Sequence, residues 1–149
     1  MSDEAIEVRQ ARADDVEQLW PLVQNFATSF RPERSAFDLA LSEMVDRVDT
    51  LVLVAVKDRG TIVGYLLGSF HGTFFANGPV AWIEELMVAE PVRRRGVASA
   101  LLSSAEVWAK SIPCAYVALA SRRASGFYLR NGYEESATFL RKVLATPEG

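Results

Sequence analysis

Apolar residues in this sequence follow two spacings, and the spacing changes near residue 50. Two early sets recur at helical intervals: Val16, Leu19, Trp20, Val23 and Phe26, then Phe37, Ala40, Leu41, Met44 and Val48. They predict two amphipathic helices. Asp14 and Glu17 have the spacing of a capping box for the first helix, in which Pro21 predicts a kink or a break. Ser35 is the expected cap of the second helix.

Beyond residue 50, short apolar runs alternate with turn residues, which predicts strands. Leu51 to Val56 has the pattern of a buried strand, and the turn at 58–60 leads into an antiparallel partner, Thr61 to His71. Strands are also expected at 6–11, 81–88, 113–120 and 133–144, and helices at 98–110 and 124–130. The sequence therefore predicts one α/β domain over residues 1–149, with a mixed, mostly antiparallel sheet flanked by helices on both faces.

The composition narrows the class of protein. With 149 residues, of which 50% are hydrophobic, the chain can bury a substantial core. Its formal net charge of -3 does not favour a nucleic-acid partner. Its longest apolar run, Leu51 to Val56, is far shorter than the roughly 20 residues that span a bilayer. A single cysteine, Cys114, and an acidic N-terminus without a signal-peptide pattern lead us to expect a cytoplasmic protein.

The segment Arg93-Arg94-Arg95-Gly96 is the most informative local feature. It lies between the strand expected at 81–88 and the helix expected at 98–110. Gly96 allows a tight turn, and the free N–H groups at a helix start carry partial positive charge. The three adjacent arginines are poor core residues, because guanidinium groups are not buried without partners. The arrangement predicts a cradle for a phosphate group.

Two signatures extend this interpretation. Arg93-x-x-Gly96-x-Ala98 satisfies the pattern Gln/Arg-x-x-Gly-x-Gly/Ala, and Ala124 to Tyr133 satisfies Ala-x-x-(aromatic)-Tyr-x-x-x-Gly-(Tyr/Phe). On these residues the chain resembles the GNAT superfamily of N-acetyltransferases, from about Glu7 to Leu144. The resemblance implies the GNAT fold and acetyl-coenzyme A as the cofactor.

Family members bind the coenzyme A pyrophosphate on backbone amides of the arginine–glycine turn and the pantetheine arm along the preceding strand. The residues that the resemblance assigns to cofactor binding are Leu86, Met87, Val88, Arg93, Arg94, Arg95, Gly96, Val97, Ala98, Ser99 and Ser121. Ser121 stands where many members carry an asparagine, and a serine reaches less far. Arg122 and Arg123 beside it would compensate through the cofactor phosphates.

Acetyl transfer to an amine requires deprotonation of the amine, stabilisation of the thioester oxygen and protonation of the leaving thiolate. The resemblance assigns the last step to Tyr128, and the Val88 N–H would stabilise the oxygen. Glu84 and Glu85 are the candidates for the base. Because neighbours in a strand face opposite sides, only one of them points into the reacting face. We favour Glu84, although a bulge in this strand would reverse the argument.

The sequence therefore predicts an acetyl-coenzyme A-dependent N-acetyltransferase that acts on a primary amine of a small molecule or peptide by direct transfer in a ternary complex. The alternative is a non-catalytic acyl-coenzyme A sensor or interaction module on the same fold. No spacing of Cys, His and Asp indicates a metal site. Many family members pair as dimers, so the resemblance also implies a homodimer, with no nucleic-acid or membrane partner.

Overall fold

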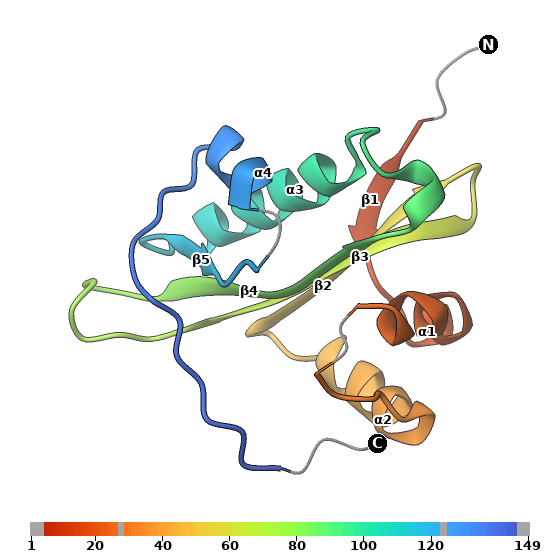
Figure 1. The fold of residues 1–149 in the computed structure, drawn as a ribbon, viewed down its shortest axis with the longest axis horizontal. Coiled ribbons are helices and arrows are strands. Elements are labelled where there is room, and N and C mark those ends of the chain that lie inside the picture. Colours follow the sequence, from red (N-terminus) through yellow and green to blue (C-terminus); the bar gives the residue numbers. More distant parts are fainter. Residues whose placement is uncertain (1–4, 27–28, 123–124, 146–149) are drawn as a thin grey trace.

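The computed structural model describes residues 5–26, 29–122 and 125–145. They form a five-stranded sheet whose spatial order follows the sequence: β1 (Glu7–Gln10), β2 (Thr50–Lys57), β3 (Thr61–His71), β4 (Val80–Val88) and β5 (Val117–Leu119). The first four strands are antiparallel to their neighbours, and β5 runs parallel to β4. Figure 1 shows α1 (Val16–Gln24) and α2 (Arg34–Met44) on one face, and α3 (Val97–Ser111) and α4 (Ser125–Arg130) on the other. The predicted fold class is confirmed.

Each face of the sheet has its own hydrophobic core. Under α3, the helix side chains of Val97, Leu101 and Leu102 pack against strand residues that include Ile83 and Val88. Under α1 and α2, the second core consists of Ala11, Leu19, Leu22, Leu41, Val54, Val56, Ile62 and Tyr65. The alternation of side chains along β2 and β3 distributes apolar residues to both cores, as a sheet with two covered faces requires.

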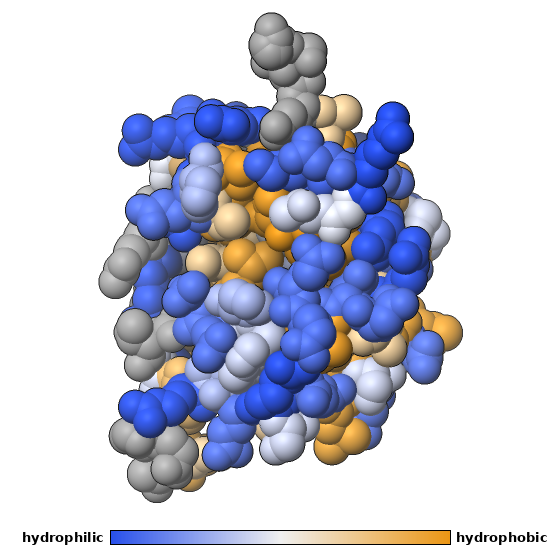
Figure 2. Space-filling view, turned by 90° about the vertical axis from the view of Figure 1, so that its right-hand side faces the viewer, coloured by the Kyte–Doolittle hydropathy of each residue, from blue (hydrophilic) through white to orange (hydrophobic). Residues whose placement is uncertain are grey.

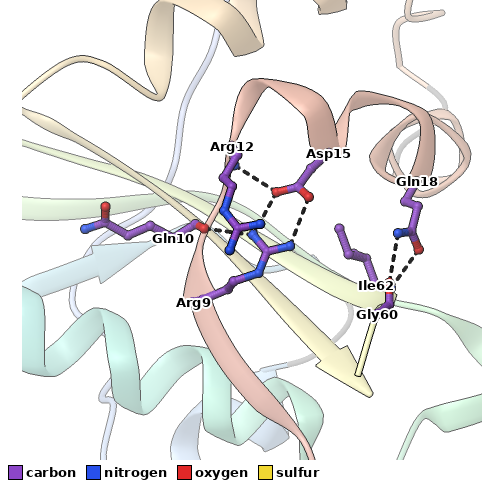
Figure 3. A network of polar contacts seen from close by, with 7 residues as sticks. All are labelled: Arg9, Gln10, Arg12, Asp15, Gln18, Gly60 and Ile62. Carbon is purple, nitrogen blue, oxygen red and sulfur yellow. Dashed lines mark hydrogen bonds and ion pairs between the residues drawn. The ribbon is translucent and has the colours of Figure 1, made fainter. Parts of the chain in front are cut away.

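A partly buried ion pair between Arg9 and Asp15 fixes the connection between β1 and α1 (Figure 3). The two terminal guanidinium nitrogens of Arg9, Nη1 and Nη2, donate to Asp15 at 2.9 and 3.0 Å, and the same carboxylate accepts the backbone N–H of Arg12 at 2.8 Å. Asp15 is 6% exposed, so its charge depends on these donors. This contact closes a 3-10 turn, η1 (Ala13–Asp15), and replaces the capping box that the sequence predicted at Asp14 and Glu17.

The two predicted helices exist with small corrections. Helix α1 continues through Pro21 to Gln24, so the predicted break is wrong. Helix α2 begins at Arg34 rather than after a Ser35 cap, and it ends before Val48, which is almost fully exposed. None of the helices in the described parts of the chain is both long and apolar enough to cross a membrane.

Two predicted strands differ from the structure. Only residues 117–119 of the expected strand 113–120 pair with β4. The expected terminal strand at 133–144 is wrong, because this segment is described but forms no strand. By contrast, the turn at 58–60 is the predicted hairpin connection, and Asp58 and Arg59 adopt positive φ values of 52° and 66°.

Candidate active site

A β-bulge interrupts β4 at the two candidate carboxylates. In the pairing of β3 with β4, Leu67 faces Glu85 and Gly68 faces Ile83, so Glu84 is the extra residue. Gly68 fits this irregularity closely, because a Cβ there would lie 3.0 Å from the Trp82 carbonyl oxygen. A bulge shifts the alternation of side chains by one position. Strand alternation therefore does not separate Glu84 from Glu85.

Glu85 points into the face of the sheet covered by α1 and α2. Its Oε1 accepts a 2.7 Å hydrogen bond from the hydroxyl of Tyr65, which belongs to the core under these helices. Burial raises the pKa of the Glu85 carboxyl, the Tyr65 hydrogen bond opposes that rise, and the nearby charge of Glu84 adds to it. The pKa of Tyr65 is also raised, chiefly by burial, so the phenol stays protonated and keeps donating to the carboxylate.

Glu84 is exposed and lies on the same face. It lines a cavity of about 360 Å³ between α2 and the sheet. The other lining residues come from the end of α2 and from β2 and β3: Met44, Arg47, Asp49, Thr50, Leu67, Gly68, Ser69, Phe70 and His71. Since Leu66 packs in the core under α3, its neighbour Leu67 faces α2. The cavity and both carboxylates therefore lie on one side of the sheet.

Strand β5 pairs over its whole length with only the first part of β4. The register joins Ala81, Trp82 and Ile83 to residues 117–119, and β4 continues from Glu84 to Val88 without a partner on that side in the part of the chain described. The N–H of Ala89 donates to the Val63 carbonyl at 2.8 Å, so the N–H and C=O of Val88 point away from β3. The backbone N–H and C=O of Leu86 also point away from β3, whereas those of Met87 point toward β3. Leu86 and Val88 thus present backbone groups along an open edge.

The arginine–glycine turn lies at the end of this open edge. The Nε of Arg93 donates to the Val88 carbonyl at 3.0 Å, which ties the turn to β4. Arg94 and Gly96 both have positive φ, 69° and 83°, and Gly96 is the N-cap of α3. In Figure 2, which views this end of the molecule, hydrophilic side chains surround an apolar strip.

The start of α3 has the free donors that a phosphate cradle needs. The N–H of Ala100 donates to the Gly96 carbonyl at 3.0 Å, which leaves the N–H groups of Val97, Ala98 and Ser99 without an intrahelical acceptor. Arg93, Arg94 and Arg95 are exposed next to these groups. The predicted turn, glycine conformation and helix start are thereby brought together as the sequence indicated.

Tyr128 lies on the opposite face from the carboxylates. Its ring packs against the core under α3 and makes edge-to-face contacts with Phe127 at 5.0 Å and with Tyr133 at 5.8 Å between ring centroids. The hydroxyl of Tyr133 donates to Glu106 of α3 at 2.7 Å, which anchors the end of α4. Burial raises the pKa of Tyr128, so its hydroxyl stays protonated at neutral pH.

The structure says less about the remaining predicted site residues and about a possible metal site. Ser121 follows β5 and is exposed, whereas Arg123 and Ala124, the first residue of the second signature, lie outside the described residues. Within the described ranges, no group of three or more His, Cys, Asp or Glu residues could hold a metal ion.

The sequence did not indicate three contacts and one cavity at the site. They are the Tyr65–Glu85 and Tyr133–Glu106 hydrogen bonds, the hydrogen bond from Arg93 to the Val88 carbonyl, and the cavity beside Glu84. Only the cavity had a signal in the sequence, because Phe70, which lines it, belongs to an aromatic cluster around the loop before the strand of Glu84: Phe70, Phe74, Phe75 and Trp82.

Comparisons with known proteins identify relatives in sequence and in fold. An aminoglycoside N(6')-acetyltransferase type 1 from Acinetobacter baumannii is 32% identical over 84 residues, which cover 52% of this chain and 57% of that protein. Among solved structures, a transcriptional regulator from Bacillus halodurans has a TM-score of 0.86 at 23% identity, covering 94% of this chain and 100% of the other. An aminoglycoside N-acetyltransferase in complex with coenzyme A has a TM-score of 0.77 at 20% identity, covering 95% and 97%.

The structural likenesses establish the fold, and a match to a family model adds the identity of the family. Residues 16–133 match the family described as the acetyltransferase (GNAT) family. This range contains β4, the arginine–glycine turn, α3 and Tyr128. The chain belongs to the GNAT acetyltransferase family.

Proposed function

We propose that the protein transfers an acetyl group from acetyl-coenzyme A directly to a primary amine of a small acceptor, within a ternary complex. One observation carries the proposal. Glu84 and Glu85 lie on the α1/α2 face of β4, Tyr128 lies on the α3/α4 face, and the edge of β4 is open. An amine arriving from one face and a thioester from the other would meet at this edge.

The residues of the turn fit coenzyme A. The free N–H groups at the start of α3 would hold the pyrophosphate, and Arg93 to Arg95 add positive charge beside them. Leu86 and Val88 direct backbone groups to the open edge, where the amides of a pantetheine arm would pair with them as an added strand does. The Val88 N–H is the donor that would stabilise negative charge on the thioester oxygen.

The two carboxylates take different roles in this proposal. Glu84 is exposed in the cavity and would bind the ammonium group of the acceptor. Glu85 would take the proton, directly or through a water, because burial raises its pKa toward the value that suits a base at neutral pH. The sequence favoured Glu84 as the base, and the bulge removes the part of that preference that rested on strand alternation. Tyr128 would then protonate the leaving thiolate.

The cavity supports a small cationic acceptor. Its volume of about 360 Å³ lies at the lower end of the range for small-molecule sites. Its carboxylates belong to Glu84 and Asp49, and Asp49 is already paired with Arg47 at 2.8 Å. Glu84 is thus the carboxylate left to receive an ammonium group. The relative from Acinetobacter baumannii is named for aminoglycosides, so we place these compounds among the first acceptors to test.

A thiol-release assay tests the proposal. It measures the free thiol of coenzyme A formed from acetyl-coenzyme A in the presence of polyamines, amino acids, peptides or aminoglycosides. We expect turnover with at least one cationic amine and a mass increase of one acetyl group on that acceptor. Binding of coenzyme A without turnover on any amine would instead support an acyl-coenzyme A sensor on this fold. The cytoplasmic location stays a prediction from the sequence.

A further inference from the structure

The cavity beside Glu84 contains a second carboxylate, and an arginine already occupies it. Nε and Nη2 of Arg47 donate to the two oxygens of Asp49 at 2.9 and 2.8 Å, and the hydroxyl of Thr50 donates to Asp49 Oδ1 at 3.0 Å. All three residues line the cavity. Both oxygens of Asp49 therefore have donors, whereas Glu84 has no hydrogen bond or ion pair within the described part of the chain.

The Arg47–Asp49 pair and Glu84 lie at opposite sides of the cavity. Asp49 directly precedes β2, Glu84 is the bulge residue of β4, and β3 lies between these two strands. Two strand spacings, roughly 10 Å, therefore separate the two carboxylates at the level of the backbone. Leu67 and Ser69 of β3 line the cavity over this interval. An acceptor whose amine binds Glu84 therefore extends across β3 toward the pair.

Pairing with Arg47 changes what the far side of the cavity can bind. The guanidinium cancels the charge of Asp49 and contacts both of its oxygens, so a second ammonium group would have to displace it. Nη1 of Arg47 has no hydrogen bond among the described residues, and the Arg47 side chain is 59% exposed. This nitrogen can donate to an oxygen atom of the acceptor. Because the pair has no net charge, an uncharged oxygen suits it better than an ion.

We propose that the Arg47–Asp49 pair sets the acceptor class: an amine bound by Glu84 whose next polar group, within reach of the pair, is a hydroxyl or carbonyl oxygen. Diamines are disfavoured, because their second ammonium group meets the guanidinium of Arg47 instead of a free carboxylate. The inference rests on the proposed function, since it takes Glu84 as the group that binds the reacting amine. Arg47 determines specificity and takes no part in acetyl transfer.

Arg47→Met separates the charge of Arg47 from its bulk. Arg47 and Thr50 also line a second cavity, of about 250 Å³, next to Trp108, so a small residue at position 47 would join the two cavities. Methionine keeps a long unbranched side chain and removes the charge. The substitution leaves Asp49 as a free carboxylate. Since exposed ion pairs contribute little to stability, the variant should fold as the wild type does.

Thiol release with three matched amines tests the proposal: an alkylamine, an amino alcohol and a diamine of equal chain length. For the wild type, kcat/KM should be about fivefold higher with the amino alcohol than with the diamine. In Arg47→Met the order should reverse, because Asp49 receives the second ammonium group. Arg47→Met/Asp49→Asn should lose both preferences, and the alkylamine should respond little to either substitution.

Arg34→Met is the matched control. It breaks exposed ion pairs with Glu17 and Asp38, and none of these three residues lines the cavity. This variant should keep the wild-type order of acceptors. A wild-type preference for the diamine, or an order that Arg47→Met leaves unchanged, would overturn the proposal.

Saturation-transfer NMR of the same amines, with coenzyme A-loaded protein, measures binding independently of turnover. Binding in the expected order without turnover of any amine would support the role of Arg47 and contradict the proposed acetyl transfer. Turnover that does not depend on residue 47 would contradict the role of Arg47 and support acetyl transfer. Absence of binding and of turnover for every amine would overturn both.

Discussion

The hydroxyl of Tyr65 donates a 2.7 Å hydrogen bond to Glu85, a residue 20 positions further along the chain. The contact connects β3 to the bulge of β4 and holds a carboxylate on the face of the sheet where the cavity beside Glu84 lies. Because the bond favours the ionised carboxylate, it moderates the rise in pKa that burial imposes on Glu85.

Tyr65→Phe should move the acidic limb of the pH profile of kcat/KM to higher pH. Removing the donor takes away a contact that lowers the pKa of Glu85, so the carboxylate form appears only at higher pH.

Glu85→Gln should abolish the acidic limb of the pH profile and lower kcat by about 10²-fold or more. Glu84→Gln should raise KM for the acceptor more than it lowers kcat. Pre-steady-state and pH-dependent kinetics on the best acceptor separate these cases. An unchanged profile in Tyr65→Phe would remove Glu85 from the reaction.

Glu85→Gln should also stabilise the fold at neutral pH. A carboxyl whose pKa is raised on folding stabilises the native state below its unfolded pKa, and this contribution is lost as the pH rises through the folded pKa. The neutral amide avoids the cost of a buried charge, so we expect a gain of about 1 kcal/mol at pH 7, or roughly 2–4 °C in Tm. Thermal melts should show the gain shrinking toward pH 4. A lower Tm at pH 7 would contradict the account.

Tyr128→Phe should lower kcat by about 10²-fold or more and leave the affinity for coenzyme A nearly unchanged, because the ring contacts with Phe127 and Tyr133 are retained while the acid is lost. Tyr116→Phe, at an exposed tyrosine before β5, is the matched control and should keep full activity. Isothermal titration and thiol release measure the two effects. Full activity of Tyr128→Phe would exclude this residue as the acid.

Gly96→Ala should cost about 1 kcal/mol of stability through backbone strain alone. Gly96 has a φ of 83°, yet a Cβ there would meet nothing within 4 Å, so no side-chain collision contributes. A shifted turn should also weaken coenzyme A binding. Gly60→Ala serves as control, because it too meets nothing within 4 Å and its φ is not in the left-handed region. Equal effects of both substitutions on Tm would refute the conformational argument.

Asp15→Asn should destabilise the protein by about 2–4 kcal/mol at pH 7, since it removes the buried charge of a partly buried pair and leaves Arg9 only partly compensated. The hydrogen bonds from Arg9, ahead of those from the backbone, lower the pKa of Asp15. A lowered pKa gives stability that is present above the unfolded value and lost as the pH falls through the folded value. Urea titrations should therefore show the deficit at pH 7 and its disappearance in acid. Asp14→Asn, at the exposed neighbour, should change little.

Much of the fold could be predicted from the sequence because its signals are local. The turn at 58–60, the glycine at 96 and the apolar spacing of the helices depend on neighbours within a few residues. The part of the candidate site that depends on neighbouring residues, the arginine–glycine turn and the start of α3, was predictable for the same reason. The terminal strand failed for a different reason: residues 133–144 have strand-like composition but lack a partner within the described chain.

By itself, the sequence determined the family, the order of the elements and the residue types available for catalysis. The tertiary structure decided on which face of the sheet each candidate catalytic side chain lies. The bulge exists because Leu67 and Gly68 of β3 pair with Glu85 and Ile83 of β4. The sequence of β4 alone does not specify this register. The depth of Glu85 and its hydrogen bond from Tyr65 arise from packing under α1 and α2, whose residues are distant in the chain. Pairing and burial are long-range properties, so the placement of the carboxylates could only be found in three dimensions.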